Sequence, residues 1–245
     1  MSNILDSHVV AYSGQSLYDF DNKIQLSWYP QRVLLYARSA ASILELGLGH
    51  GLTTAFFSQH FDRHLALEAS PAVIRHFRES YPACRAEIRE TYFEQFESDE
   101  KFDLIVMGFV LEHVDNPVEI MSYYRRFLAP GGKMFVTVPN AEVLNRRLGH
   151  IAGMLDDIQQ LSDHDRMCGH KRYFTVKSLS ADVRKAGYEI ERIEGIYLKP
   201  FTTAQMISLN FTQEVIDALC EVGIEYPELC CGILAQIREA GHENV

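Results

Sequence analysis

A glycine-rich turn is the first segment of the sequence whose residue types could do chemistry. Glu45–Gly51 reads ELGLGHG, follows a short apolar run and precedes a segment of helical period. Glycines in a strand-to-helix turn accept positive φ and let a ligand lie against bare backbone, while the free N–H groups of the helix start favour a negative group. The pattern indicates either a nucleotide-type cleft at the carboxyl ends of the strands or a turn with a purely structural role.

Two further residues narrow the ligand that such a cleft would hold. A dinucleotide fingerprint needs Gly or Ala at position 52, and Leu52 there argues against bound NAD or FAD. The spacing G-x-G-x-G is instead typical of sites for S-adenosylmethionine. Glu68 ends the next apolar run, about 20 residues beyond the first glycine, where a carboxylate can accept hydrogen bonds from both hydroxyls of a ribose.

Alternating elements must position these residues. Short apolar runs of strand type cover residues 42–46, 64–68, 102–107 and 133–138, and a weaker, charged strand is placed at 84–89 by the rhythm. Segments of helical period cover residues 52–60, 71–81 and 117–128, the last two opened by proline. Strands that alternate with helices predict the α/β class, with a doubly wound sheet covered on both faces.

The rhythm changes after Asn140 and is less regular before residue 42. The segments expected there are a leading helix at 23–41 that Pro30 kinks or splits, an interrupted helix at 142–161, a polar loop at 163–171, a helix at 176–186, helical material at 201–222, and late strands at 188–197 and 232–237. No linker or repeat marks a boundary. We therefore expect one domain over 1–245, with a helical lid segment at 1–41, a cofactor-binding core at 42–140, and acceptor-side helices and final strands at 141–245.

Composition excludes several classes of protein. The 245 residues are 47% hydrophobic and 23% charged, which rules out collagenous and largely disordered chains. A net charge of −10 disfavours binding to nucleic acid. No apolar run approaches the roughly 20 residues of a membrane span, and residues 1–6 do not resemble a secretion signal. Five cysteines without a CxxC pair indicate reduced thiols, so we predict a cytoplasmic protein.

With these motifs in order, the chain resembles the class I S-adenosylmethionine-dependent methyltransferases, in the small-molecule branch with a methyltransferase type 11 or type 12 domain. The resemblance covers roughly residues 40 to 200. It rests on the segments at 45–51, 67–70, 102–117, 128–140 and 169–188. It implies a Rossmann-like sheet of seven strands whose last two form an antiparallel pair, S-adenosyl-L-methionine as cofactor and S-adenosyl-L-homocysteine as product.

The resemblance also implies which residues hold the cofactor. Those expected around the methionine moiety are Glu45, near its amino group directly or through water, Gly47, Leu48, Gly49, Gly51, Gly108, Phe109 and one lid tyrosine, Tyr12 or Tyr18. Those expected around the adenosine are Glu68 at the ribose, Ala69 beside the adenine, and Tyr92 or Phe93 packed on it. In many relatives an acidic residue takes the place of this last pair, so the hydrogen bond to the adenine amino group is in question here.

Histidines are the candidates for action on the acceptor. Methyl transfer from a sulfonium is an in-line displacement, so the enzyme mainly holds an acceptor lone pair opposite the departing sulfur, and a histidine base helps with a hydroxyl or a protonated amine. His170 lies in the polar loop where this branch places acceptor-facing residues. His113 either shares in catalysis or ties its loop to its neighbours. We expect Glu112 to be a scaffold residue.

Two groups near His170 have alternative interpretations. One stretch contains five residues of metal-ligating types: Asp163, His164, Asp165, Cys168 and His170. Their crowded spacing favours a hydrated loop over a metal site, so we predict no metal. The same region also contains four cations: Arg146, Arg147, Lys171 and Arg172. If they converge, they indicate an anionic acceptor. A solvated helix face explains Arg146 and Arg147 equally well.

These observations predict an S-adenosylmethionine-dependent methyltransferase acting on an oxygen or nitrogen of a small polar, anionic or sugar-derived metabolite, as a monomer or homodimer. RNA or protein methylation is a rival. The acidic balance argues against RNA, as does Gly108–Leu111 in place of the N-P-P-Y-type tetrapeptide of base aminomethylases. A second rival is a catalytically inactive homologue that only binds the cofactor.

Overall fold

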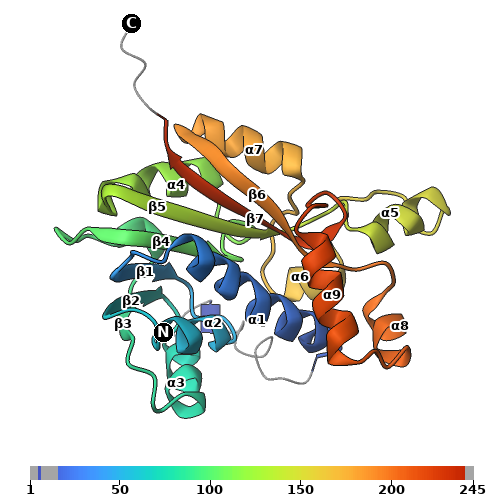
Figure 1. The fold of residues 1–245 in the computed structure, drawn as a ribbon, viewed down its shortest axis with the longest axis horizontal. Coiled ribbons are helices and arrows are strands. Elements are labelled where there is room, and N and C mark those ends of the chain that lie inside the picture. Colours follow the sequence, from blue (N-terminus) through green and yellow to red (C-terminus); the bar gives the residue numbers. More distant parts are fainter. Residues whose placement is uncertain (1–4, 7–15, 241–245) are drawn as a thin grey trace, which may run out of the picture.

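A twisted seven-stranded sheet organises the computed structural model, which describes residues 5–6 and 16–240 (Figure 1). The strands are β1 (Ser42–Leu46), β2 (Arg63–Glu68), β3 (Glu87–Glu90), β4 (Phe102–Gly108), β5 (Leu128–Pro139), β6 (Tyr188–Leu198) and β7 (Cys230–Glu239). Their order is β3-β2-β1-β4-β5-β7-β6, and β7 runs antiparallel to both β5 and β6. The predicted Rossmann-like fold and its final antiparallel pair are confirmed.

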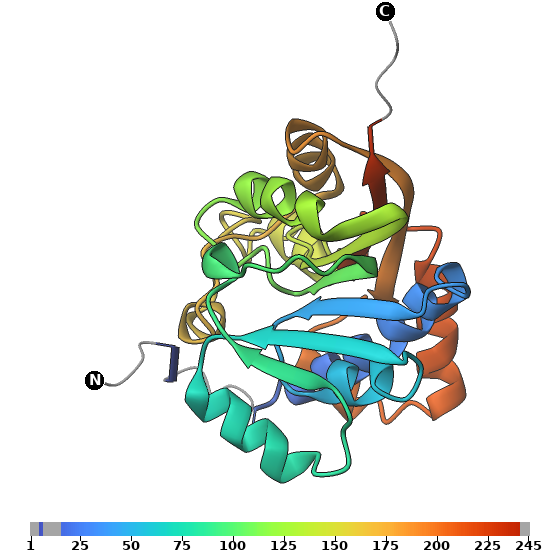
Figure 2. The same ribbon diagram turned by 90° about the vertical axis from the view of Figure 1, so that its left-hand side faces the viewer.

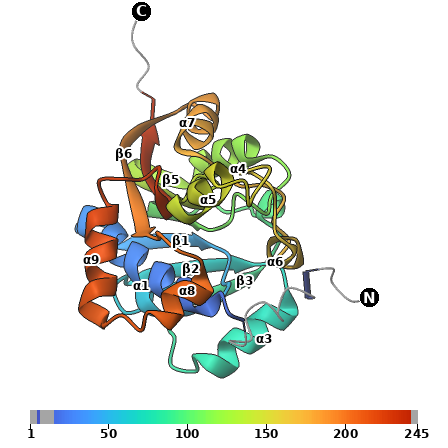
Figure 3. The ribbon, with the colours of Figure 1, turned by 90° about the vertical axis from the view of Figure 1, so that its right-hand side faces the viewer.

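Helices cover both faces of this sheet. On one face lie α1 (Asp19–Tyr36), α2 (Leu52–Phe57), α3 (Pro71–Ser80), α8 (Thr203–Ser208) and α9 (Gln213–Gly223). On the other face lie α4 (Pro117–Tyr124) and α7 (Val176–Lys185), opposite α1 and α9 (Figure 3). In Figure 2 the teal helix α3 lies below β2 and the edge strand β3. The short helices α5 (Leu144–Ile151) and α6 (Asp163–Met167) belong to the long connection between β5 and α7.

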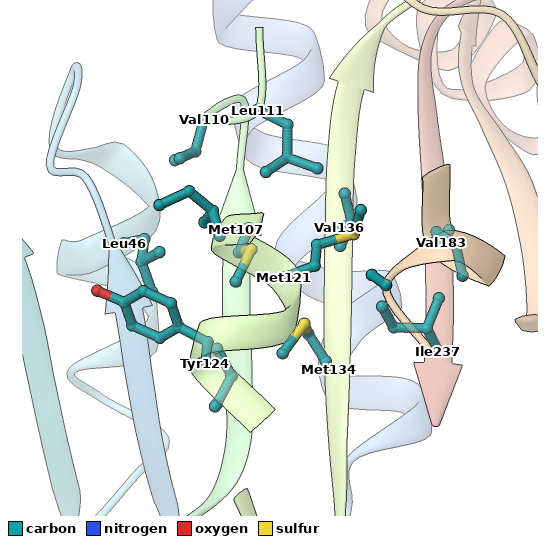
Figure 4. Packing of buried hydrophobic residues seen from close by; sticks show 14 of the residues in the cluster. Leu46, Met107, Val110, Leu111, Met121, Tyr124, Met134, Val136, Val183 and Ile237 are labelled. Carbon is teal, nitrogen blue, oxygen red and sulfur yellow. The ribbon is translucent and has the colours of Figure 1, made fainter. Parts of the chain in front are cut away.

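The central strands are apolar on both sides because both faces are covered. In β4, residues 104–107 are all buried, as the near-continuous apolar run predicts for a parallel strand. Figure 4 shows Met121 and Tyr124 of α4 packed over Met107 and Met134 of the sheet. Fully burying a side chain of this size contributes roughly 1.5–3 kcal/mol. This core holds the carboxyl ends of β1, β2 and β4 rigidly at one edge.

Helix starts agree closely with the sequence signals. Ser70 accepts a hydrogen bond from the backbone N–H of Val73 before Pro71, and Asn116 accepts one from that of Glu119 before Pro117. Such caps satisfy N–H groups that have no partner within the helix. The helix α3 therefore begins shortly beyond the end of β2, whereas α4 begins after the connection 109–116 that follows β4.

Several expected elements differ from the structure. The leading helix is not split at Pro30, which lies buried inside α1, because proline removes a single helical N–H. The helix expected at 142–161 covers only α5, and Gly153 with φ of 70° follows its end. The expected polar loop at 163–171 contains α6, which a capping box between Ser162 and Asp165 stabilises. The helix expected at 117–128 ends at Tyr124, since a 3₁₀ turn at Arg125–Phe127 leads directly into β5.

Two further findings concern the cysteines and the length of the apolar helices. All five cysteines are free thiols. Among residues 5–6 and 16–240, no helix has both the length and the apolar character needed to cross a membrane.

Candidate active site

A cavity of about 950 Å³ opens at the carboxyl ends of β1, β2 and β4. Its walls come from the glycine turn, the ends of β2 and β4, the start of α1, and the segments around α5, α6 and α8. Ligands of α/β proteins bind at this edge of the sheet, because loops after the strands can vary there without disturbing the core. The cavity is large enough for a nucleoside-sized ligand together with a small second molecule.

The glycine turn forms one wall of this cavity. Gly47, Gly49 and Gly51 all have positive φ, at 80°, 47° and 77°. A Cβ atom built on Gly49 would meet no described heavy atom within 4 Å. The turn therefore leaves open space against bare backbone, which is where the sequence places the methionine moiety of a cofactor.

Glu68 is the carboxylate of this wall. Its two oxygens accept hydrogen bonds from backbone N–H groups on either side, that of Leu48 at 3.2 Å and that of Ser70 at 2.9 Å. Burial raises the pKa of Glu68, and these N–H groups oppose that shift. The carboxylate is thus fixed at the end of β2 and lines the cavity, in the position predicted for a contact with ribose hydroxyls.

The expected adenine contacts lie beside Glu68. Ala69, Tyr92 and Phe93 all line the cavity. Tyr92 is 41% exposed, whereas Phe93 packs against the core and its carbonyl accepts a hydrogen bond from the Tyr124 hydroxyl at 3.0 Å. Phe93 is therefore the more rigid of the two aromatic surfaces predicted for the adenine.

Glu45 turns its carboxylate toward neighbouring side chains of the fold. Its carboxylate is buried, accepts a hydrogen bond from the Thr53 hydroxyl at 2.8 Å and lies 2.9 Å from Nε2 of His64. Glu45 is not among the described residues that line the cavity, while Thr53 is. The alternation of side chains along β1 directs Glu45 beneath the turn, and its expected place near a cofactor amino group, directly or through water, stays a prediction.

The first turns of α1 supply residues that sequence reasoning missed. Asp21 and Gln25 line the cavity, and among the described residues nothing donates to Asp21 Oδ1 or Gln25 Oε1. Lys199 Nζ lies 2.5 Å from the other Asp21 oxygen. Buried oxygens without donors favour a ligand that brings N–H or O–H groups, such as the ammonium group of S-adenosylmethionine. The only sequence signal was the position of acidic residues in the first turn of an amphipathic helix.

The remaining residues expected around a cofactor also line the cavity. Gly108 and Phe109 line it at the end of β4, and the Phe109 ring packs edge to face with Tyr29 at 5.9 Å. Tyr18 also lines the cavity and stacks on the His164 ring at 4.3 Å. Tyr12, the other lid tyrosine, lies outside the described residues.

Glu112, His113 and His170 line the part of the cavity where the acceptor is expected from the sequence. The two histidine rings meet edge to face at 4.8 Å, so the structure brings both predicted catalytic histidines together. Glu112 is fully buried, and burial raises its pKa to about 7. Burial would lower the pKa of His170, but the carboxylates of Asp165 and Glu112 outweigh it and raise that pKa.

The four cations expected near the acceptor converge only in part. Arg146 and Lys171 line the cavity, whereas Arg147 and Arg172 are absent from its described lining. Arg146 donates to the carbonyls of Ile158 and Gln160 and stacks over Tyr173, and Lys171 pairs with Asp115 at 2.5 Å. Two of the four cations therefore line the cavity, and the anionic acceptor stays a prediction.

The five residues weighed as a metal site within one loop do not cluster as ligands. Asp165 is held by Ser162 and Tyr173, Cys168 Sγ lies 3.5 Å from Nε2 of His164, and the Asp163 side chain is fully exposed. Among described residues, the metal-ligating types that do come together are Glu112, His113 and His170. These belong to two segments far apart in the sequence.

Comparison with known proteins identifies this arrangement. A family model described as a methyltransferase domain matches residues 24–193. The chain is 26% identical over 186 residues to a ubiquinone biosynthesis O-methyltransferase of Xylella fastidiosa strain 9a5c, covering 74% of this chain and 72% of that protein. It resembles a Thermotoga maritima S-adenosylmethionine-dependent methyltransferase, described as a possible histamine N-methyltransferase, with TM-score 0.62 and 16% identity over 96% of this chain and 98% of that one.

A further solved structure carries a bound product. It is the Burkholderia thailandensis 1,6-didemethyltoxoflavin-N1-methyltransferase with its acceptor and S-adenosylhomocysteine. The TM-score is 0.62 and the identity 14%, with 97% of this chain and 88% of that one covered. At these identities, both structural comparisons establish the fold.

Proposed function

Because this chain belongs to the methyltransferase family whose model matches residues 24–193, we propose that it methylates an oxygen or nitrogen of a small polar metabolite. The chain is a class I S-adenosylmethionine-dependent methyltransferase, and S-adenosylmethionine is its methyl donor. The observation that carries the proposal is that one cavity joins the glycine turn and Glu68 to the wall of Glu112, His113 and His170. A donor and an acceptor would meet there.

When bound, S-adenosylmethionine supplies an electrophilic methyl group on its sulfonium. We assign the ribose hydroxyls to Glu68, the adenine to Ala69 and Phe93, and the ammonium group to Asp21 and Gln25. The backbone of the glycine turn is proposed to hold the methionine moiety, with Gly108, Phe109 and Tyr18 on its other side. These contacts would fix the direction of attack, which is the main source of rate enhancement in an in-line displacement.

The acceptor is placed on the side of Glu112, His113 and His170. His113 and His170 are the residues we propose to act on its proton, and Asn145 Oδ1 is a further buried oxygen without a donor among the described residues. An acceptor that carries hydroxyl or amino groups would satisfy these oxygens. Arg146 and Lys171 also line the cavity, and Lys171 pairs with Asp115 while Arg146 donates to neutral carbonyls, so an anionic group on the acceptor stays a prediction.

Relatives support the small-molecule class. The names quoted above refer to O-methylation in ubiquinone biosynthesis, to a possible histamine N-methyltransferase and to N1-methylation of 1,6-didemethyltoxoflavin. We extend only their common feature, a small acceptor, to this chain. The single-domain organisation over 1–245, with its lid, core and acceptor parts, and the cytoplasmic location also stay predictions.

The test combines binding with turnover. Calorimetry with S-adenosylhomocysteine should show one site per chain. Release of S-adenosylhomocysteine from S-adenosylmethionine should then depend on a hydroxyl- or amine-bearing metabolite from a panel that includes tRNA as the competing class. Turnover with tRNA alone would replace the proposal by RNA methylation. Binding with no turnover on any member would favour the inactive homologue.

A further inference from the structure

The cluster of Glu112, His113 and His170 carries an inference beyond methyl transfer itself. One ligand atom from each residue lies within 4.8 Å of the other two. The first two residues follow β4, and the third lies beyond α6. We infer that these three side chains bind a divalent transition cation, such as Zn²⁺, Mn²⁺ or Co²⁺, at the acceptor end of the cavity.

Glu112 is the observation that points to a ligand. Its side chain is completely buried, and within the part of the chain that the structure describes neither carboxylate oxygen receives a hydrogen bond. A buried carboxylate without donors is strongly unfavourable unless a positive partner compensates for its lost hydration. The residue also lines the cavity, so a cation can reach it from solvent. A metal bond would supply the missing compensation.

The surroundings of His170 resemble the support that metal ligands need. Asp165 Oδ1 lies 3.4 Å from Nδ1 of His170, and Asp165 is itself fixed by the Ser162 hydroxyl at 2.5 Å and the Tyr173 hydroxyl at 2.6 Å. A carboxylate behind a ligating histidine orients the ring and strengthens its bond to the metal. The cluster is therefore braced by its neighbours.

Backbone contacts join the two segments that supply the ligands. The N–H of Lys171 donates to the carbonyl of Glu112 at 2.8 Å, and the Arg172 guanidinium donates to the carbonyl of Val114 at 2.9 Å. These bonds hold His170 beside Glu112 in the folded chain. The three ligand atoms are thus brought together before any ion binds, so little conformational entropy is lost on binding.

The donor set selects the kind of ion. Two imidazoles and one carboxylate suit Zn²⁺, Mn²⁺, Fe²⁺ or Co²⁺, whereas Mg²⁺ and Ca²⁺ prefer oxygen ligands alone. Three protein ligands leave coordination positions open, as in catalytic rather than structural sites. The open positions would face the acceptor space, because all three residues line the cavity.

This assignment rests on the proposed function and refines its acceptor class. A cation there would bind the hydroxyl oxygen of an acceptor and favour release of its proton to water. The oxygen would then form a bond to the methyl carbon as the bond from that carbon to sulfur breaks, with S-adenosylhomocysteine leaving neutral. The inference therefore favours O-methylation, with His113 and His170 acting through the cation.

Metal binding can be measured without turnover. Tag-free protein is stripped with a chelator, dialysed, and titrated with Zn²⁺, Co²⁺ and Mg²⁺ by calorimetry and by metal analysis after equilibrium dialysis. We expect one Zn²⁺ or Co²⁺ per chain and much weaker Mg²⁺ binding. The visible absorption of bound Co²⁺ should report its protein ligands. Absence of stoichiometric Zn²⁺ or Co²⁺ binding would overturn the inference.

A graded set of variants locates the site. Glu112→Gln, which keeps the side-chain volume, should lose the most affinity, Asp165→Asn should lose about tenfold, and the exposed Asp163→Asn should bind as the parent does. His113→Ala serves in place of Glu112→Gln if that variant fails to fold. Affinity that is unchanged in Glu112→Gln and His113→Ala would contradict the assignment.

Two controls separate this inference from the proposed function. S-adenosylhomocysteine affinity should be the same in the parent and in folded Glu112→Gln, because the cofactor residues are elsewhere in the cavity. If protein stripped with a chelator turned over at the full rate, and added Zn²⁺ did not raise that rate, the cation would have no role in the reaction. The proposed methyl transfer would be unaffected by that result. If the parent protein did not bind S-adenosylhomocysteine at all, that result would instead count against the proposed function.

Discussion

The two ends of the cavity are built in different ways. Part of the proposed cofactor end comes from residues 47–51 and 68–69, at the ends of the neighbouring strands β1 and β2, and much of this part is backbone. The acceptor end brings together side chains at 112–113 and 170, joined by tertiary hydrogen bonds and rich in groups that change charge. The contrast indicates that the glycine-turn part of the proposed donor site is set by local sequence, whereas the proposed acceptor wall depends on contacts between distant segments.

The largest expected effect is at Gly108, where the cofactor end meets the core. A Cβ added there would overlap the Tyr29 hydroxyl oxygen and lie 2.9 Å from its Cζ atom, and Tyr29 is fully buried. Overpacking of this kind costs roughly 1–3 kcal/mol, and we expect the upper end of this range because the overlapped ring is buried. Urea unfolding of Gly108→Ala should therefore show a strongly lowered free energy of unfolding, together with weaker S-adenosylhomocysteine binding.

A second substitution sharpens that test. Tyr29→Phe removes the overlapping hydroxyl, so Gly108→Ala should destabilise a Tyr29→Phe background less than it destabilises the parent. Equal losses in the two backgrounds would show that the Tyr29 hydroxyl does not cause the effect.

Next in size is the effect of Glu68→Gln on the cofactor end. The amide cannot accept hydrogen bonds on both sides, so a ribose hydroxyl loses a charged partner, which costs roughly 1.5–3 kcal/mol and raises the Kd for S-adenosylhomocysteine at least about tenfold. Calorimetry measures this change. Glu90→Gln is the matched control, because Glu90 also ends a strand but is exposed and is not among the described residues lining the cavity. Equal affinity of the two variants would remove Glu68 from the site.

The same contrast explains what the sequence could predict. The alternation of strands and helices, the glycine turn and Glu68 follow from local patterns, because a buried parallel strand and a capped helix each have a signature within ten residues. The seven strands with a final antiparallel pair were instead expected from the family resemblance. The convergence of Glu112 with His170 has no such signature, because it depends on how the β5–α7 connection folds back. For the same reason the metal question was posed for one loop, although the ligating types come from two.

The local sequence pattern did not predict the partner of the Glu45 carboxylate or the cavity residues of α1. Glu45 is in the predicted position along β1, yet the partner that its carboxylate meets, His64, is on the next strand and could not be foreseen. Asp21 and Gln25 were overlooked because the contacts expected from the lid segment 1–41 were tyrosines, whereas polar side chains of the first turns of α1 also line the cavity. In both cases the deciding contact is between elements.

A smaller effect is expected from Arg146, which braces the acceptor end. Arg146→Met would remove hydrogen bonds to the carbonyls of Ile158 and Gln160 and the stack on Tyr173, so the segment after α5 would loosen. We expect KM for the acceptor to rise several-fold while the Kd for S-adenosylhomocysteine stays constant. Arg147→Met is the control, since Arg147 pairs with Glu142 at 3.5 Å and is absent from the described lining. Weakened cofactor binding in Arg146→Met would contradict the separation of the two ends.

The smallest expected effect has the opposite sign and lies in α5, on the acceptor side. Gly149 is helical, and a Cβ built there would meet only the Leu155 Cβ, at the ordinary contact distance of 3.9 Å. Alanine in a helix is favoured over glycine by up to about 1 kcal/mol, because it restricts the unfolded chain. Gly149→Ala should thus raise the free energy of unfolding slightly in urea, with cofactor affinity unchanged. A lower free energy of unfolding would mean that α5 is packed as tightly around Gly149 as the core is around Gly108. The two ends would then differ in their chemical groups but not in their packing.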